Sequence, residues 1–339
     1  MIFNSNNEYG KLRSVVIGRA ANANWPTDDP NFTRYWKYAC YTKDVKFPYK
    51  FDNEIIEHVD EMICDIIDTL NELDIEVVRP RIENWTNGVA THQYVTTGMN
   101  TLAMRENLIS IGNKVIECPH IFRAKHWEGS IAYQPIKKYV QANGGVYITA
   151  PRIDLVQGTM THDTKKNELV CRNEDPIFSG CDILKFGKTI LYFTSCKSNM
   201  LGAEWLQGVL GDEFKVVPTN RFYFYEGLNN NILPLDDSTL LVNADRIGAE
   251  AIPKELKDYR KIMVSDIKDT KCFKHAYGSK YQNFQILSLD PVTKIVDTGQ
   301  PQLSKLLTAY GFEVIEKNLP HTQTFGFGYH SLVTDLVRE

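Results

Sequence analysis

The sequence predicts a single α/β domain built from five similar modules that close into a ring. A helical segment followed at once by a short apolar strand recurs five times along the 339 residues. Pairs of strands lie between these joints, so that each module has the order strand, strand, helix, strand. Unevenly spaced copies of one such unit are typical of a cyclic repeat architecture. In a closed ring, the strand ends and turns of every module would surround a central channel.

The first module begins with a strand at residues 11–18. From Asn53, apolar residues recur at the spacing of one helix face, and Asp74 ends this helix. A strand at residues 75–80 follows at once. Residues 20–50 lie between the first strand and the helix and show no periodicity, so they predict a long loop over one face. Ordered loops of this length are usually functional.

The other modules repeat the joint between helix and strand. The joints are residues 135–142 with 146–151, 198–210 with 214–218, 254–259 with 261–264, and 302–310 with 312–315, the first and third being looser copies. The paired strands are residues 108–111 with 114–117, 182–184 with 189–193, and 231–234 with 239–242. A doubly wound open sheet is the competing fold. It requires a glycine-rich phosphate turn after the first strand, and residues 18–22 do not provide one.

Composition excludes several classes of protein. The formal charge of −4 gives no reason to expect nucleic acid or an anionic membrane as partner. No apolar run approaches the roughly 18 residues of a membrane span, and the N-terminus lacks the basic and apolar regions of a signal peptide. The seven cysteines are scattered without a C-x-x-C pair, which predicts reduced thiols in a cytoplasmic protein. Because no ligand spacing points to zinc, we expect neither a metal nor a cofactor.

The C-terminal tail carries the clearest signal for chemistry. Gly326 and Gly328 allow tight backbone geometry, and a short strand follows at residues 332–337. His330 and Ser331 lie at the hinge between glycine loop and strand, where a nucleophile is presented to a pocket. From spacing alone, the simpler interpretation is a C-terminal strand that closes a sheet, with Ser331 as an ordinary turn residue.

Segments spread over most of the chain carry a resemblance to a known family. They are residues 8–20, 112–119, 123, 128, 149–151, 199–206, 243–246, 278–280 and the tail, 325–338. On these collinear segments the chain resembles the amidinotransferases of the pentein superfamily, typified by arginine:glycine amidinotransferase and inosamine-phosphate amidinotransferase. The resemblance implies a five-fold pseudosymmetric β/α propeller, the pentein fold, as one domain over residues 1–339.

The resemblance also implies a ping-pong reaction. A cysteine thiolate attacks the guanidinium carbon of arginine, ornithine leaves, and a second amine takes the amidino group from the thiouronium intermediate. A histidine moves the protons, and aspartates hold the guanidinium. This chemistry needs an activated thiolate beside a base. It also needs carboxylates that form charge-assisted hydrogen bonds with the cationic group.

Most of these parts are replaced in this sequence. Ser331 stands at the position of the cysteine nucleophile, and Gly227 stands at the position of the histidine base. Ser179 replaces an aspartate that binds the guanidinium, and Asn229 replaces an aspartate that supports the histidine. Glu106 replaces another substrate-binding aspartate conservatively. The resemblance therefore implies that the catalytic triad is lost.

Other positions of the family are kept. Asp182 is a retained acid, and Arg246 and Ser279 resemble substrate-contacting positions. His330 is a further candidate for substrate binding, but it is not expected to act as a base. A serine hydroxyl is a weak nucleophile without an adjacent base, and neighbouring side chains on a strand point to opposite faces. The four replacements together indicate loss by descent and not one engineered change.

Several candidates have two interpretations. Arg246 and Glu106 either form a pocket for a polar, amino-acid-like or sugar-like ligand, or form a structural ion pair. Cys181 is either a relocated nucleophile or, as we favour, a small apolar residue. Glu226 either replaces a lost acid or base at the channel mouth and contacts substrate, or is a solvated loop residue. The segment 22–36 is expected to cover the channel as a lid.

Three functions are consistent with the sequence. The first is a divergent homologue that keeps a polar small-molecule pocket, with different chemistry or non-catalytic binding. The second is an active transferase of amidinotransferase type that uses Ser331 or a relocated group. The third is a regulatory or structural pseudoenzyme partner. An open channel with convergent polar groups favours an enzyme, whereas a channel plugged by the aromatic residues 222–225 favours a scaffold. The expected ligand is amino-acid-like, guanidino or amine, with no nucleic acid or membrane partner, and a homodimer is allowed.

Overall fold

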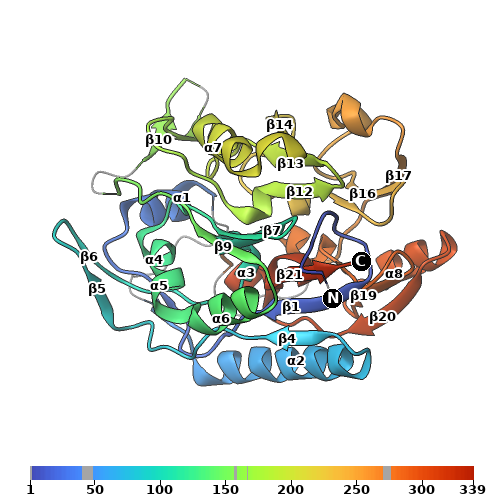
Figure 1. Cartoon of the computed structure of the whole chain (residues 1–339), viewed down its shortest axis with the longest axis horizontal. Coiled ribbons are helices and arrows are strands. Elements are labelled where there is room, and N and C mark those ends of the chain that lie inside the picture. The colour runs from blue at the N-terminus through green and yellow to red at the C-terminus, as the bar shows by residue number, and fades with distance from the viewer. Residues whose placement is uncertain (1, 40–48, 156–158, 166, 270–275) are drawn as a thin grey trace.

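Five three-stranded sheets form the frame of the protein (Figure 1). The computed structural model describes residues 2–39, 49–155, 159–165, 167–269 and 276–339. In every sheet the middle strand pairs antiparallel with one neighbour and parallel with the other. Four sheets follow the chain in order: β7 (Leu108–Ile111), β8 (Lys114–Glu117) and β9 (Val146–Thr149); β12 (Ile183–Phe186), β13 (Thr189–Phe193) and β14 (Lys215–Thr219); β15 (Ile232–Pro234), β16 (Thr239–Asn243) and β17 (Arg260–Val264); β18 (Leu287–Ser288), β19 (Thr293–Asp297) and β20 (Glu313–Lys317).

The fifth sheet joins the two ends of the chain and closes the ring. Its middle strand β1 (Leu12–Ile17) pairs antiparallel with β21 (Val333–Arg338) and parallel with β4 (Glu76–Val78). Outside the strand pairing, the Lys11 amide donates to the Glu339 carbonyl, and the two termini lie near each other (Figure 1). Five modules are confirmed, and four of them have the predicted order strand, strand, helix, strand. The tail supplies the first strand of module one.

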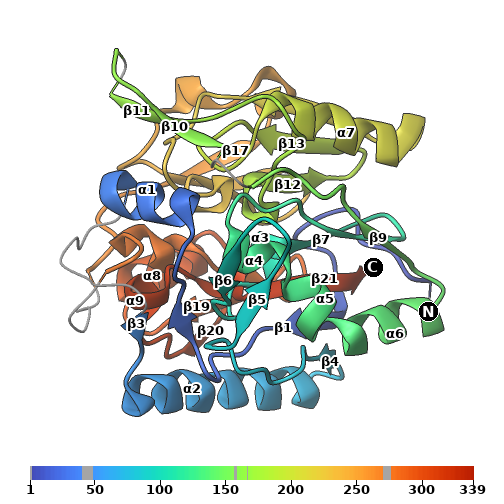
Figure 2. The same ribbon diagram turned by 90° about the vertical axis from the view of Figure 1, so that its left-hand side faces the viewer.

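Helices join the middle strand to its parallel neighbour in four of the modules. They are α2 (Asn53–Glu72), α6 (Gln134–Ala142), α7 (Met200–Leu210) and α8 (Pro301–Ala309). Figure 2 shows α2 and α7 at opposite edges of the molecule, outside the sheets. α2 buries Val59, Ile63 and Ile66 on one face, as the helical spacing predicted. None of the helices in the described ranges has both the length and the apolar character that crossing a membrane requires.

In the module of β15 to β17, the predicted helix at residues 254–259 is wrong. This stretch forms only a 3-10 turn, Lys254–Leu256. Leu256 is its one buried side chain, and so short a segment cannot repay the cost of nucleating an α-helix. The remaining short elements are the hairpins β5 (Gly88–Ala90) with β6 (Val95–Thr97) and β10 (Met160–Asp163) with β11 (Glu168–Cys171), and helices α4 (Arg123–His126), α5 (Glu128–Ala132) and α9 (Thr322–Phe325).

The prediction of a loop throughout residues 20–50 was also wrong. Helix α1 (Pro30–Ala39) lies within this segment, and β2 (Asn24–Trp25) pairs with β3 (Tyr49–Lys50) across it, residues 40–48 being outside the described ranges. Proline fits the first position of a helix. The buried aromatic residues that hold α1 in place have helical spacing: Phe32, Tyr35 and Trp36.

Aromatic packing fastens α1 to the ring. The rings of Trp25 and Trp36 lie 4.3 Å apart, and Phe32 stacks on Tyr277 with ring centroids 6.0 Å apart. Tyr35 lies 5.7 Å from the same Tyr277 ring. Aromatic pairs at these distances stabilise beyond their buried area. Residues 30–36 of the predicted lid therefore lie in a packed helix, and Tyr35 is held by its neighbours.

The middle of the ring contains buried ion pairs where an apolar core is usual. Arg105 contacts Asp335 at 2.6 Å and Glu8 at 3.1 Å, and Arg338 contacts Asp335 at 3.0 Å. Lys185 of β12 also pairs with Asp335. Burial alone would raise the pKa of Glu8, but Arg105 and Lys185 lower it to about 2. These pairs tie the N-terminal segment, β12 and β21 together through charges that are costly to leave unpaired.

Candidate functional site

The candidate site lies where five short helical turns meet, one from each module. Each turn precedes the first strand of its sheet: α3 (Met104–Asn107), η1 (Gly180–Asp182), η3 (Leu228–Asn230), η6 (Lys280–Phe284) and α10 (Tyr329–Leu332), the three η elements being 3-10 turns. α3 contacts η1, η1 contacts η3, η3 contacts η6, and α10 contacts α3. The five-fold repeat therefore brings residues that are far apart in the sequence to one place.

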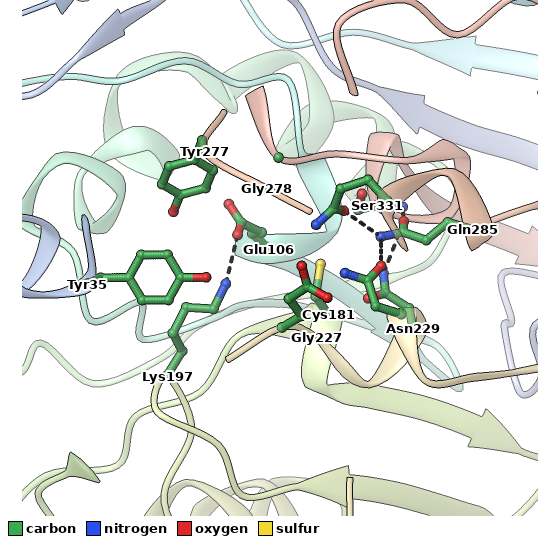
Figure 3. Close-up of a pocket in the computed structure, with 14 residues that line it drawn as sticks. Tyr35, Glu106, Cys181, Lys197, Gly227, Asn229, Tyr277, Gly278, Gln285 and Ser331 are labelled. Carbon is green, nitrogen blue, oxygen red and sulfur yellow. Dashed lines mark hydrogen bonds and ion pairs between the residues drawn. The ribbon is translucent and has the colours of Figure 1, made fainter. Parts of the chain in front are cut away.

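A small cavity lies at this meeting point (Figure 3). All five turns contribute to its lining, which consists of Tyr35, Glu106, Cys181, Lys197, Glu226, Gly227, Asn229, Asn230, Tyr277, Gly278, Gln282, Gln285, Gly326 and Ser331. Its free volume is about 20 Å³, which is room for roughly one water molecule. Polar side chains fill the middle of the ring, and none of the aromatic residues 222–225 lines this cavity in the described part of the chain.

Ser331, the candidate at the nucleophile position, lies on α10 and not at the start of a strand. Its hydroxyl donates to the Gly328 carbonyl at 3.1 Å and accepts from the Gly328 amide at 2.9 Å. The Ser331 amide donates to Gln285 Oε1 at 2.9 Å. The hydroxyl hydrogen thus points at a backbone carbonyl, which cannot take a proton as a general base would.

His330 lies behind the cavity wall. Its Nδ1 is 3.2 Å from Asn229 Nδ2, and its Nε2 is 3.3 Å from Glu8 Oε2. The prediction that His330 and Ser331 lie at the start of a strand was wrong, because both lie on α10. On a helical turn, neighbouring side chains diverge by about 100°. Burial, with Arg105 nearby, lowers the pKa of His330 to about 4. His330 therefore supports Asn229 instead of contacting the cavity, in which it was expected to bind substrate.

The position of Gly227 has no room for a side chain. A Cβ at this residue would lie 2.6 Å from Asn229 Oδ1 and 2.9 Å from Cys181 Cβ. Real Cβ atoms essentially never approach other heavy atoms within 3.0 Å. The space that a side chain at residue 227 would need is therefore occupied by Asn229 and Cys181.

Four carboxamide side chains line the cavity near Ser331 (Figure 3). Gln285 is their centre: its Nε2 donates to Asn230 Oδ1 and to Gln282 Oε1, and its Oε1 accepts from Asn229 at 3.3 Å. We call Asn229, Asn230, Gln282 and Gln285 the amide network. It offers both hydrogen-bond donors and acceptors but no group that titrates near neutral pH.

Glu106 lies across the cavity from the amide network and is paired with two lysines. Its Oε1 is 3.2 Å from Lys197 Nζ, and its Oε2 is 3.5 Å from Lys125 Nζ. Burial alone would raise the pKa of Glu106, but Lys197 and Lys125 lower it to about 2. Burial alone would lower the pKa of Lys197, but Glu106 outweighs this and raises it well above its ordinary value. Both groups are therefore charged at neutral pH.

Ser179 and Asp182 support the turn η1 and do not line the cavity. The Ser179 hydroxyl donates to the Glu106 carbonyl and accepts from the Cys181 amide, both at 3.4 Å. Asp182 Oδ2 accepts hydrogen bonds from Ser195 at 2.7 Å and Ser198 at 2.6 Å. Burial raises the pKa of Asp182 to about 6.

Cys181 lines the cavity but is a poor nucleophile. Burial and the nearby Glu106 raise the pKa of its thiol to about 12. Because the thiolate is the reactive form, this free thiol stays inert at neutral pH. The geometry agrees with the favoured interpretation of Cys181 as a small buried residue.

Arg246 forms an ion pair at the rim of the cavity, but not with Glu106. Its Nη2 lies 3.0 Å from Glu226 Oε2 and 3.3 Å from Ser279 Oγ. The proposed pairing of Arg246 and Glu106 was therefore wrong. Both oxygens of Glu106 already face lysines, and Glu226 is the carboxylate beside Arg246.

The guanidinium of Arg246 is also sandwiched between two phenol rings. It lies 3.6 Å from the centroid of Tyr223 and 4.2 Å from that of Tyr281, distances at which cations attract aromatic faces. Glu226 is 6% exposed and accepts from the Ser279 amide at 3.2 Å. It is therefore not a solvated loop residue. Glu226 lines the cavity, and Arg246 and Ser279 hold it there.

Curated relatives align with almost the whole chain. Inosamine-phosphate amidinotransferase 1 of Streptomyces griseus is 27% identical over 334 residues, which cover 98% of this chain and 96% of the relative. The mitochondrial glycine amidinotransferase of Xenopus tropicalis is 25% identical over 372 residues, which cover 98% and 82%. No protein-family model matches the chain.

A solved structure of inosamine-phosphate amidinotransferase from Streptomyces griseus superposes with a TM-score of 0.93 at 26% identity, over 99% of this chain and 97% of that one. Over nearly its whole length, the chain is therefore similar to the amidinotransferases of the pentein superfamily. The DDAH of Pseudomonas aeruginosa shares the fold, with a TM-score of 0.61 at 13% identity. The predicted five-fold pseudosymmetric β/α propeller is thus confirmed.

Several lining residues were not predicted from the sequence: Tyr35, Lys197, Tyr277 and three members of the amide network, Asn230, Gln282 and Gln285. Gly278 and Gly326 lie in segments that carry the resemblance, but they were not expected to line a pocket. One signal was readable: Phe32, Tyr35 and Trp36 have the spacing of a buried helix face. Lys197 gave no such signal, since it is one lysine in the connection between β13 and α7.

Proposed function

We propose that this chain is a ligand-binding member of the amidinotransferase family that does not transfer amidino groups through a covalent adduct. The observation that carries this proposal is the environment of Ser331. Its hydroxyl exchanges hydrogen bonds with the backbone of Gly328, and the position of the base, Gly227, is filled by Asn229 and Cys181. An unactivated hydroxyl cannot attack a guanidinium carbon at a useful rate.

The other nucleophilic groups in the cavity do not replace Ser331. The Cys181 thiol stays protonated because its pKa is raised to about 12. Lys197 stays an ammonium because Glu106 raises its pKa well above the ordinary value, despite burial. A protonated thiol and an ammonium are not nucleophiles. A relocated nucleophile therefore has no support among the cavity-lining residues.

The proposed ligand is a small polar molecule. Convergent polar groups with defined partners line the cavity, as is usual for small-molecule sites. The relatives named inosamine-phosphate and glycine amidinotransferase bear the names of small amines, which supports the same class of ligand. Because the cavity holds about 20 Å³, a ligand must displace part of its wall. Tyr35 and Tyr277 form the side opposite the amide network (Figure 3).

The proposal is tested by searching for turnover and binding in parallel. The protein is incubated with L-arginine and amine acceptors, then analysed for ornithine and, by intact mass, for an added amidino group. Thermal shift with arginine, ornithine, glycine, guanidino compounds and phosphorylated sugars detects binding. A ligand at a hundredfold excess over its Kd stabilises by about 2.7 kcal/mol. We expect stabilisation without ornithine or adduct.

Either of two results would overturn the proposal. Ornithine formation or an amidino adduct would make the chain a working transferase. Failure of every ligand to bind would favour a regulatory or structural partner, the one alternative that the small free volume of the cavity supports.

A further inference from the structure

We propose that the ammonium group of Lys197 occupies the place beside Glu106 that the positively charged group of a ligand would need. The cavity then accepts a ligand whose buried end is a neutral or anionic oxygen acceptor, and it rejects a guanidinium. This inference rests on the proposed ligand-binding function and extends it to the class of ligand. It rests on the pairing of Glu106, the position of the Lys197 ammonium and the chemistry of the opposite wall.

Glu106 is the carboxylate inside the cavity, and both of its oxygens already face an ammonium group. Lys197 is 3.2 Å from Oε1, and Lys125 is 3.5 Å from Oε2. Lys125 also pairs with Glu128 at 3.3 Å, so it is shared between two buried carboxyl groups. A guanidinium entering beside Glu106 would be a third cation next to one carboxylate. Like charges in a desolvated site repel far more strongly than in water.

The other carboxylate of the lining does not offer an alternative partner. Glu226 is paired with Arg246 at 3.0 Å and accepts from the Ser279 amide. Asp182 lies outside the lining and is hydrogen-bonded to two serines. Among the described lining residues, each carboxylate therefore has a cationic partner from this chain. A ligand cation would have to displace one of them.

The Lys197 ammonium can donate a hydrogen bond to an acceptor atom of a ligand in the cavity. An ammonium has three donors, and among the described residues Glu106 Oε1 is its hydrogen-bond acceptor. The Tyr35 ring lies beside the ammonium, with its centroid 5.4 Å from Nζ (Figure 3). This leaves donor capacity for an oxygen in the cavity. Guanidinium has donors only and cannot use it, whereas a carbonyl or carboxylate oxygen can.

The opposite wall favours the same class of ligand. The amide network lines the wall beside Ser331. The Nε2 of Gln285 donates to Asn230 and Gln282, and its Oε1 accepts from Asn229 and the Ser331 amide. The lining amides left for a ligand are therefore those of the other three members of the network. A ureido or carboxamide group could accept from Lys197 at one end and exchange hydrogen bonds with the amides at the other. Such a group has nearly the shape of a guanidinium but no charge. Since the two groups nearly match in size, the cavity discriminates between them by charge.

The test compares L-arginine with L-citrulline, which differ in a guanidinium against a ureido group on the same skeleton. Kd values for both are measured by calorimetry on the wild type, Lys197→Ala and a control, Lys188→Ala. Lys188 is exposed and pairs with Glu213 outside the cavity. We expect the wild type and the control to prefer citrulline. We expect Lys197→Ala to shift the ratio of the two Kd values toward arginine by tenfold or more, because the charge of Glu106 is then available to the cation of the ligand.

Two results would overturn the inference: a wild type that binds arginine as tightly as citrulline, or a Lys197→Ala variant that gains no arginine binding. Lys197→Gln carries the same test if the alanine variant does not fold, since it keeps a donor but removes the charge. Failure of the proposed function is distinguishable, because it is seen as ornithine or a mass adduct in the wild type, or as no binding of any ligand by the wild type and Lys197→Ala, which would overturn both proposals. A shift in the ratio without either product supports both proposals.

Discussion

The substitution Gly227→Ala tests whether the position of the base is closed. The new methyl group would lie 2.6 Å from Asn229 Oδ1, 2.9 Å from Cys181 Cβ and 3.0 Å from the Cys181 carbonyl oxygen. The Asn229 side chain can rotate away, but it then loses its hydrogen bonds to Gln285 and His330. Cys181 Cβ is fixed to the backbone and cannot move alone. The backbone of Gly227, at φ −62°, is one that alanine adopts without strain.

The magnitude follows from these contacts. Overpacking costs about 1–3 kcal/mol, and two lost hydrogen bonds cost about 1 kcal/mol each. Replacing glycine with alanine also lowers the conformational entropy of the unfolded chain, which stabilises the fold by about 0.4–1 kcal/mol. We therefore expect Gly227→Ala to lower the free energy of unfolding by about 2–4 kcal/mol, measured from urea unfolding at equilibrium.

The matched control is the same substitution at Gly208. This glycine is exposed within α7, and a Cβ there meets no atom within 4 Å. Since alanine is the better helix former, Gly208→Ala should raise the free energy of unfolding by about 0.5–1 kcal/mol. If Gly227→Ala is as stable as the wild type, the claim that no base fits at this position is refuted.

Three further predictions concern the charges and Ser331. Asp335→Asn should cost about 3–5 kcal/mol in urea unfolding because Arg105 and its neighbours keep buried charges without their partner; Asp65→Asn, at an exposed pair with Lys317, should cost no more than about 1 kcal/mol. An equal loss in both variants would contradict this. The pKa values of Glu8 and Glu106 are lowered to about 2, so the two paired carboxylates stabilise the fold above pH 4.5, and this stabilisation is lost as pH falls toward 2. A free energy of unfolding that stays constant between pH 4.5 and pH 2 would disprove their pairing. Ser331→Cys should form no amidino adduct with arginine by intact mass, because no base contacts the residue; an adduct would show that a thiol alone suffices.

The strands and helices of most modules could be predicted from the sequence, because the patterns that indicate them span only a few neighbouring residues. The strands predicted at residues 108–111 and 114–117 match β7 and β8 in full. Such elements follow from the alternation of apolar residues and from turn residues within a few positions. Where a local signal was short or overlooked, as at residues 254–259 and in α1, the prediction was wrong.

The site was only partly predictable. Glu106, Glu226, Gly227, Asn229 and Ser331 were singled out from the sequence through the family resemblance, and the structure places all of them on one cavity. Their partners could not be predicted. That Glu226, and not Glu106, pairs with Arg246 depends on which turns become neighbours when the ring closes.

The sequence by itself therefore determined the five modules, the resemblance to the amidinotransferases and the candidate positions at Ser331 and Gly227. The tertiary structure alone decided what fills those positions: Asn229 and Cys181 close the space beside Gly227, and Lys197 lies against Glu106. The physical reason is that the order of strands and helices depends on neighbouring residues in the chain. The charge and free volume of the cavity depend on side chains from five separate turns, which meet only after β21 has closed the ring.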